Sequence, residues 1–161
     1  MKLDIVLLEP EIPQNTGNIA RTCVAIGARL HLVGPLGFSL EDRYLKRAGL
    51  DYWFDLDVTL WDHLDDCLDA LGRTETAEGP AGIFYATTKA SASYADAAYP
   101  ERTVLVFGPE SRGLPVPLLL ARPERCIRIP MIAGKRSLNL SNAVAVVAFE
   151  VLRQSGFQGL S

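Results

Sequence analysis

The sequence predicts a single-domain α/β protein, residues 1–161, with a mostly parallel sheet and helices on both faces. Strand-like and helix-like segments alternate along the chain, as they do in folds built from βαβ units. The strand-like runs are almost continuously apolar, which is typical of parallel strands that are buried on both sides. A length of 161 residues is sufficient for one domain with a substantial core.

Five apolar runs are the predicted strands. They are Leu3–Leu8, Arg29–Val33, Gly82–Thr87, Thr103–Phe107 and Cys126–Ile129. A short aromatic piece, Tyr52–Phe54, could add a sixth strand. Because Asp4 and Glu9 accompany the first run, we expect a strand there and not a signal peptide.

Four segments have helical patterns. The first begins at Asn15 or Thr16, either of which could cap it, and runs to Ile26 before a stop at Gly27. The other three predicted helices are Thr59–Leu71, Pro117–Ala121 and Leu140–Gln154. The polar segment Thr74–Pro80 is predicted to be a connector between elements.

The last predicted helix, Leu140–Gln154, has apolar side chains around nearly its whole circumference. A helix at the end of a small domain normally keeps one polar face. A second surface must therefore cover this helix. We expect a homodimer that uses it, with burial inside the same chain as the alternative explanation.

The composition is that of an ordinary soluble globular protein, with 48% hydrophobic and 22% charged residues. No apolar run approaches the roughly 18 residues of a membrane span, so we expect no membrane association. Cys23, Cys67 and Cys126 lie far apart without Cys-x-x-Cys spacing, which argues against a disulfide framework and a zinc site. The scattered carboxylates give no metal-ligand pattern either. With no export signal, a reducing cytoplasm is the expected location.

The densest group of polar residues lies in the segment Ile129–Ala143, which leaves a predicted strand and enters the last helix. Its polar and cationic side chains are Lys135, Arg136, Ser137, Asn139, Ser141 and Asn142. A helix start requires one capping residue, and this segment offers several. Polar side chains and free amides at a helix N-terminus can bind an electron-rich ligand. We therefore favour a binding loop here over a plain helix cap.

Two more polar turns follow predicted strands, Glu9–Arg21 after the first and Phe107–Pro115 after the fourth. The second turn is not a phosphate loop, because Leu114 and Pro115 stand where Lys and Ser or Thr belong. No Gly-x-Gly-x-x-Gly fingerprint of a dinucleotide fold occurs either. Ligands bind at the carboxyl ends of the strands in open parallel sheets. We therefore expect these turns, together with Tyr85–Lys89, to form one site.

The two histidines lie outside the predicted site. His31 falls inside a predicted strand and His63 in an acidic helical segment. Since the chain also lacks a nucleophile elbow, a hydrolytic triad is not expected, and both histidines are interpreted as structural.

Several motif-like segments follow one another along almost the whole chain. They are Glu9-Pro-Glu-Ile-Pro13, Asn15-Thr-Gly-Asn18 with Arg21, Arg47–Tyr52, Thr87-Thr-Lys89, Phe107-Gly-Pro-Glu110, Arg112–Pro115, Ile129-Pro-Met131 and Arg136–Val144. In this order they resemble the motifs of the SPOUT (trefoil-knot) RNA 2′-O-methyltransferases. Within that superfamily the chain is most similar to the bacterial tRNA (cytidine/uridine-34)-2′-O-methyltransferases.

The resemblance implies a deep C-terminal trefoil knot, S-adenosyl-L-methionine as cofactor, and no separate RNA-binding domain. Knots are otherwise essentially absent from proteins, so periodicity alone could not have suggested one. By position in the motifs, the implied cofactor-binding residues are Ala86, Thr87, Gly108, Ile129, Met131, Ser137 and Leu138.

The implied reaction is methyl transfer to the ribose 2′-OH of tRNA nucleotide 34, a cytidine or a modified uridine. The implied catalytic residues are Arg21, Asn15, Asn142 and Glu110. Because a guanidinium stays protonated, we favour oxyanion stabilisation or substrate orientation by Arg21, with a general-base role left open. Asn15 and Asn142 are expected to position the substrate or Arg21, and Glu110 to orient loops across the dimer.

The implied partner is the anticodon loop of tRNA. Since the net charge is −3, RNA contact must come from local cations gathered across the dimer. The candidates are Arg43, Lys46, Arg47, Arg112, Lys135 and Arg136. Two alternatives stay open: 2′-O-methylation of another tRNA position or of rRNA, and a non-catalytic RNA-binding or assembly protein on the same fold. A Rossmann-type nucleotide enzyme is disfavoured by the missing glycine fingerprint.

Overall fold

The computed structural model describes residues 1–40, 55–73, 81–135 and 137–161. In these residues a single sheet has the strand order β3-β2-β1-β5-β4-β6, and every pairing in it is parallel. The strands are β1 (Lys2–Leu8), β2 (Arg29–Val33), β3 (Val58–Trp61), β4 (Gly82–Ala86), β5 (Arg102–Phe107) and β6 (Cys126–Ile127). The predicted α/β class is therefore confirmed.

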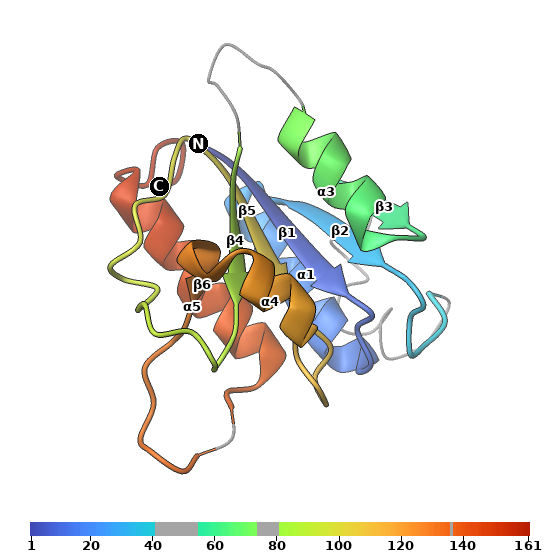
Figure 1. Ribbon diagram of the computed structural model, residues 1–161. Coiled ribbons are helices and arrows are strands. Elements are labelled where there is room, and N and C mark those ends of the chain that lie inside the picture. The colour runs from blue at the N-terminus through green and yellow to red at the C-terminus, as the bar shows by residue number, and fades with distance from the viewer. Residues whose placement is uncertain (41–54, 74–80, 136) are drawn as a thin grey trace.

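Helices cover both faces of this sheet (Figure 1). They are α1 (Pro13–Ile26), α3 (Leu64–Arg73), α4 (Val116–Ala121) and α5 (Leu140–Gln154), with a short 3-10 turn, η1 (Pro123–Arg125). Alternate residues of β1 show the two layers. Ile5 and Leu7 belong to the core cluster that includes α1 and α5, whereas Val6 and Leu8 belong to the cluster that includes α3 and α4. Burial on both sides is the reason that these strands are continuously apolar.

One predicted helix is wrong at its beginning. Residues Val58–Trp61 form β3 at the edge of the sheet, and α3 begins only at Leu64. The strand pairs with β2 in parallel, from Leu30 opposite Val58 to Val33 opposite Trp61. Leu60 and Leu64 happen to have helical spacing, but Val58 and Thr59 are β-branched and favour a strand. Pairing with β2, which the local pattern does not reveal, decides the outcome.

The expected cap of the first helix is also wrong. Helix α1 begins at Pro13, its N-cap residue is Ile12, and no side chain caps it. Proline fits the first helical position because its missing N–H would lack a partner there in any case. The predicted end is confirmed, since Gly27 adopts the left-handed conformation with φ 67°.

Helix α5 has the predicted bounds and is capped by Asn139. Val144, Val147 and Val151 are buried inside the chain, whereas Val146 and Phe149 are 38% and 47% exposed. Burial within the chain thus accounts for part of the apolar circumference and leaves a strip uncovered. The homodimer stays a prediction.

Some expectations fall outside the described residues. They are the Tyr52–Phe54 strand, the Thr74–Pro80 connector, and the cations Arg43, Lys46, Arg47 and Arg136. The order of strands does not report how the chain is threaded, so the trefoil knot also stays a prediction.

The three cysteines are free and buried. Burial raises the pKa of the Cys23 and Cys67 thiols to about 12, so both stay protonated at neutral pH. Within the described part of the chain, no group of three or more His, Cys, Asp or Glu side chains is arranged to hold a metal ion. None of the described helices is long and apolar enough to cross a membrane.

Candidate active site

The carboxyl ends of four strands lie at one level of the sheet. Phe107 at the end of β5 is opposite Leu7 of β1 and Ala86 of β4, and Ala86 is opposite Ile127 of β6. The turns that leave these strands therefore start side by side. Between β1 and β5 the connections diverge, since the chain leaves β1 for β2 on one side, and β5 for β6 on the other. Such a divergence opens a crevice where parallel sheets bind ligands.

A cavity of about 780 Å³ occupies this edge of the sheet. Its lining includes all the residues that the motifs assign to the cofactor: Ala86, Thr87, Gly108, Ile129, Met131, Ser137 and Leu138. Apolar walls come from side chains such as Phe107 and Ile129, and polar groups from Thr87, Ser137 and Lys89. A mostly apolar cleft with a few converging polar groups is typical of small-molecule sites.

The turn after β5 forms one wall of the cavity, and two glycines give it its shape. A Cβ at Gly108 would lie 2.3 Å from the backbone carbon of Gly113 and 2.4 Å from the nitrogen of Leu114. The turn thus folds back on its own beginning so tightly that only glycine fits there. Gly113 has φ +68°, a conformation that side-chain-bearing residues rarely adopt.

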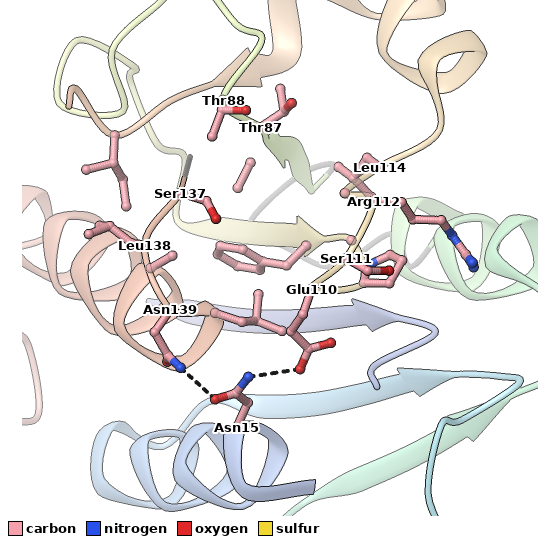
Figure 2. A pocket seen from close by; sticks show the side chains of 18 of the residues that line it. Asn15, Thr87, Thr88, Glu110, Ser111, Arg112, Leu114, Ser137, Leu138 and Asn139 are labelled. Carbon is pink, nitrogen blue, oxygen red and sulfur yellow. Dashed lines mark hydrogen bonds between the residues drawn. The ribbon is translucent and has the colours of Figure 1, made fainter. Parts of the chain in front are cut away.

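A chain of side-chain hydrogen bonds joins three of the turns (Figure 2). The Nδ2 of Asn139, at the start of α5, donates to Oδ1 of Asn15 at 2.9 Å. The Nδ2 of Asn15 donates in turn to Oε1 of Glu110 at 3.0 Å. Asn15 is 5% exposed, so both ends of its amide are used inside the protein. Asn15 therefore links opposite walls of the cavity.

The turns after β1 and β5 are connected further by three acidic side chains. Glu110 accepts from the backbone N–H groups of Glu11 and Ile12, at 2.8 and 3.2 Å. Glu11 accepts from the backbone N–H and the hydroxyl of Ser111, at 2.9 and 2.7 Å. Glu9 forms an ion pair with Arg112. Glu110 thus connects two turns of one chain, and its predicted role across a dimer stays a prediction.

The remaining predicted residues are placed differently. Arg21 is exposed on α1, and Asn142 is exposed in the first turn of α5, and neither lines the cavity. Lys135 is exposed in the loop before α5, also outside the lining. Arg112 does line the cavity, and its side chain is 62% exposed although it is paired with Glu9. One chain alone thus gathers the predicted cofactor residues together with Asn15 and Glu110, but not Arg21 and Asn142.

The sequence does not predict the parts played by Glu11, Ser111 and Asn139. The sequence predicts Asn139 only as a member of the polar segment before the last helix, whereas in the structure it caps α5 and donates to Asn15. The signal available for Glu11 was its position between Pro10 and Pro13 in a rigid turn. Its partner, Ser111, lies 100 residues away in the sequence, so no local pattern could have paired them.

Comparison with known proteins agrees with this geometry. The family model of the SpoU rRNA methylase family matches residues 2–149. The tRNA (cytidine(34)-2′-O)-methyltransferase of Escherichia coli strain K12 is 48% identical over 98% of this chain and 96% of its own length. The chain therefore belongs to the SpoU methylase family.

Two solved structures are also similar. One, described as giving structural insights into the 2-OH methylation of C/U34 on tRNA, is 46% identical with a TM-score of 0.88 and covers 98% of each chain. The other is the AdoMet-bound rRNA methyltransferase from Sinorhizobium meliloti, 25% identical with a TM-score of 0.81. This alignment covers 94% of our chain and 56% of that one.

Proposed function

We propose that this protein transfers a methyl group from S-adenosyl-L-methionine to the ribose 2′-oxygen of nucleotide 34 of tRNA. The observation that carries the proposal is the cavity at the strand ends, lined by every residue that the motifs assign to the cofactor. The names of relatives that match almost the whole chain support the same substrate and position. We expect the protein to act in the cytoplasm, where tRNA is modified.

The residues of the cavity fit a nucleoside that carries a charged amino-acid tail. Ile129, Leu138 and Phe107 supply apolar surface for a base, and Thr87 and Ser137 supply hydroxyl groups. Its volume of about 780 Å³ lies within the range of small-molecule sites, roughly 300–1,000 Å³. When bound, S-adenosyl-L-methionine supplies an electrophilic methyl group on a sulfonium centre.

The protein's own contribution is alignment and charge stabilisation. Methyl transfer would require the ribose 2′-oxygen to give its proton to a base, a role left open for Arg21, and to lie in line with the methyl carbon and the departing sulfur. Correct alignment alone supplies about 7–11 kcal/mol in favourable systems. The Glu110–Asn15–Asn139 chain of hydrogen bonds serves this purpose, because it fixes the turns on both sides of the cavity.

Arg21 is assigned to the negative charge that develops on the ribose oxygen, or to the adjoining phosphate. Its exposed position on α1 fits contact with RNA that approaches the cavity from outside. We expect Arg21→Ala to lower kcat at saturating tRNA by at least a hundredfold while S-adenosyl-L-methionine still binds. Near-full methylation by this variant would contradict the assignment.

Exposed cations near the cavity are assigned to the phosphates of the anticodon loop. Lys135 is exposed just before the start of α5. We expect Lys135→Ala to weaken tRNA binding for all sequences and to reduce the slope of log K against log salt by about 1. Filter binding at several salt concentrations measures this slope. An unchanged slope would remove Lys135 from the RNA-contacting set.

The decisive experiment is incubation with labelled S-adenosyl-L-methionine and total tRNA, followed by nucleoside mapping. We expect label on the 2′-oxygen of nucleotide 34. Label on rRNA or on another tRNA position would identify a different methyltransferase. Binding of RNA without any methyl transfer would favour a non-catalytic protein on the same fold.

A further inference from the structure

We propose that Glu11 is a positioning residue that holds the β5–α4 turn, residues 108–115, in the conformation that forms the cavity wall. Glu11 itself does not line the cavity, whereas its partner Ser111 does. The inference rests on the proposed function, because it concerns the binding of S-adenosyl-L-methionine to this cavity.

The backbone of Glu11 is fixed from two sides. Gly37 packs against Glu11 so closely that a Cβ added to Gly37 would lie 2.8 Å from the Cα of Glu11. The N–H of Gly37 also donates to the carbonyl of Pro10 at 2.9 Å. On the other side, the N–H of Glu11 donates to Oε2 of Glu110 at 2.8 Å. The carboxylate of Glu11 therefore projects from an immobilised backbone.

The tip that it holds belongs to a turn whose other ties are the hydrogen bonds of Glu110 and the Glu9–Arg112 ion pair. Ser111, Arg112 and Gly113 are all exposed at the tip of their turn. The two oxygens of Glu11 are used separately, Oε2 by the backbone N–H of Ser111 at 2.9 Å and Oε1 by its hydroxyl at 2.7 Å. Hydrogen bonds to an ionised acceptor are roughly twice as strong as neutral ones. Glu11 thus holds the exposed tip of the turn at Ser111, while Glu110 at the start of the same turn holds the backbone of Glu11 in return.

The Glu11–Ser111 contact affects ligand binding because the turn is rigid within itself. The contact of Gly108 with Gly113 and Leu114 makes residues 108–114 one tightly folded unit, and all of them line the cavity. When Ser111 is released, the unit populates conformations in which the wall is displaced. Apparent affinity falls in proportion to the fraction of molecules whose site is correctly formed.

The test compares the wild type with Glu11→Ala, and with Glu124→Gln as a control that removes a carboxylate elsewhere on the surface. Glu124 is exposed, whereas Glu11 is half-buried, and Glu124 lies in η1 and does not line the cavity. Native-state amide exchange on the ligand-free protein should show Ser111 exchanging about tenfold faster in Glu11→Ala. The amide of residue 12 should stay protected in this variant, because its acceptor Glu110 is untouched.

Calorimetry with S-adenosyl-L-methionine gives the second readout. We expect about tenfold weaker binding by Glu11→Ala, a matching rise in the KM for S-adenosyl-L-methionine, and a kcat within twofold of the wild type. Glu124→Gln should have the same affinity, KM and kcat as the wild type. Unchanged exchange at Ser111 together with affinity within twofold would overturn the proposal.

A double-mutant cycle with Ser111→Ala separates the contact from general damage to the fold. The hydroxyl lies on an exposed turn, so its removal should leave folding intact. If Glu11 acts through Ser111, Ser111→Ala should weaken the binding of S-adenosyl-L-methionine less in the Glu11→Ala variant than in the wild type. Full additivity would contradict the inference. Failure of the wild type to bind S-adenosyl-L-methionine would instead remove the proposed function, and ligand-free exchange would still decide whether Glu11 holds the turn.

Discussion

Asn15 illustrates how one buried amide can join segments that are distant in sequence. Its donor and its acceptor both have protein partners, Glu110 and Asn139. An amide satisfied in this way positions other groups and does not itself need to contact the substrate. We therefore expect Asn15 to support catalysis by holding the two walls of the cavity at a fixed separation.

Replacement of Asn15 should be costly because its partners are left without their hydrogen bonds. We expect Asn15→Ala to lower the free energy of unfolding by about 1–3 kcal/mol, as measured by urea denaturation. Asn18→Ala is the control, since Asn18 is exposed on the same helix. Equal effects of the two substitutions would mean that the hydrogen-bond chain adds nothing to stability.

Asp4 of β1 stabilises the sheet through polar contacts with β2, which extend to β3. Arg29 binds its carboxylate through two nitrogens, at 2.7 and 2.9 Å, and His31 contacts it at 2.9 Å. Trp61 donates to the other nitrogen of His31 at 3.1 Å. His31 is thus part of a structural cluster, in agreement with its interpretation from sequence.

The pKa of Asp4 predicts how stability depends on pH. Burial acts to raise this pKa, but the hydrogen bonds from His31 and Arg29 outweigh burial and hold it below its ordinary 3.8. The unfolded chain therefore takes up the proton at higher pH than the folded protein does. The stabilisation is complete well above pH 3.8 and is lost as the pH falls through the folded value.

Asp4→Asn should be less stable than the wild type at pH 7, and its stability should fall less steeply on acidification below about pH 4. Urea unfolding monitored at a series of pH values gives both quantities. Parallel pH profiles for the two proteins would contradict the assignment of this dependence to Asp4.

At the scale of elements, the turns require particular residue types more strictly than the strands and helices that they connect. Strands such as β5 need only be apolar and of the right length, and many sequences meet that requirement. The turn after β5 needs glycine at two positions for different reasons. Gly108 lacks room for a Cβ, whereas Gly113 has free space around it but a left-handed backbone.

This difference gives a paired prediction for the same turn. Gly108→Ala should displace the turn and abolish detectable binding of S-adenosyl-L-methionine, because the added carbon would meet backbone and not a flexible side chain. Gly113→Ala should cost only about 1 kcal/mol of stability and should retain binding. Calorimetry and thermal unfolding of both variants test this order, and tighter binding by Gly108→Ala than by Gly113→Ala would refute it.

At the scale of the whole molecule, we propose that a second copy of the chain completes the site. Arg21 and Asn142 do not line the cavity of the single chain, and α5 leaves Val146 and Phe149 exposed. Both observations agree with the proposed homodimer through α5, in which residues of a partner could approach the cavity.

Phe149→Asp should shift the protein toward a monomer of 17.6 kDa, because a charge would enter the apolar contact. Size-exclusion chromatography with light scattering measures the mass. Leu120→Asp is the control, since Leu120 is 74% exposed on α4, on the other face of the sheet. A wild type that elutes as a single 17.6 kDa species would exclude the dimer.

The sequence by itself determined the α/β class, most strand positions and the end of α1 at Gly27, and its resemblance to a known family named seven of the residues that line the cavity. These features follow from local information: continuous apolar runs, glycine stops and motifs placed after strands. The tertiary structure decided that Val58–Trp61 pairs with β2 and is not helical. It also decided that Glu11 binds Ser111 and that Asn15 joins Glu110 to Asn139. Each of these depends on a contact between residues that only the folded chain brings together, and no local pattern records such a contact.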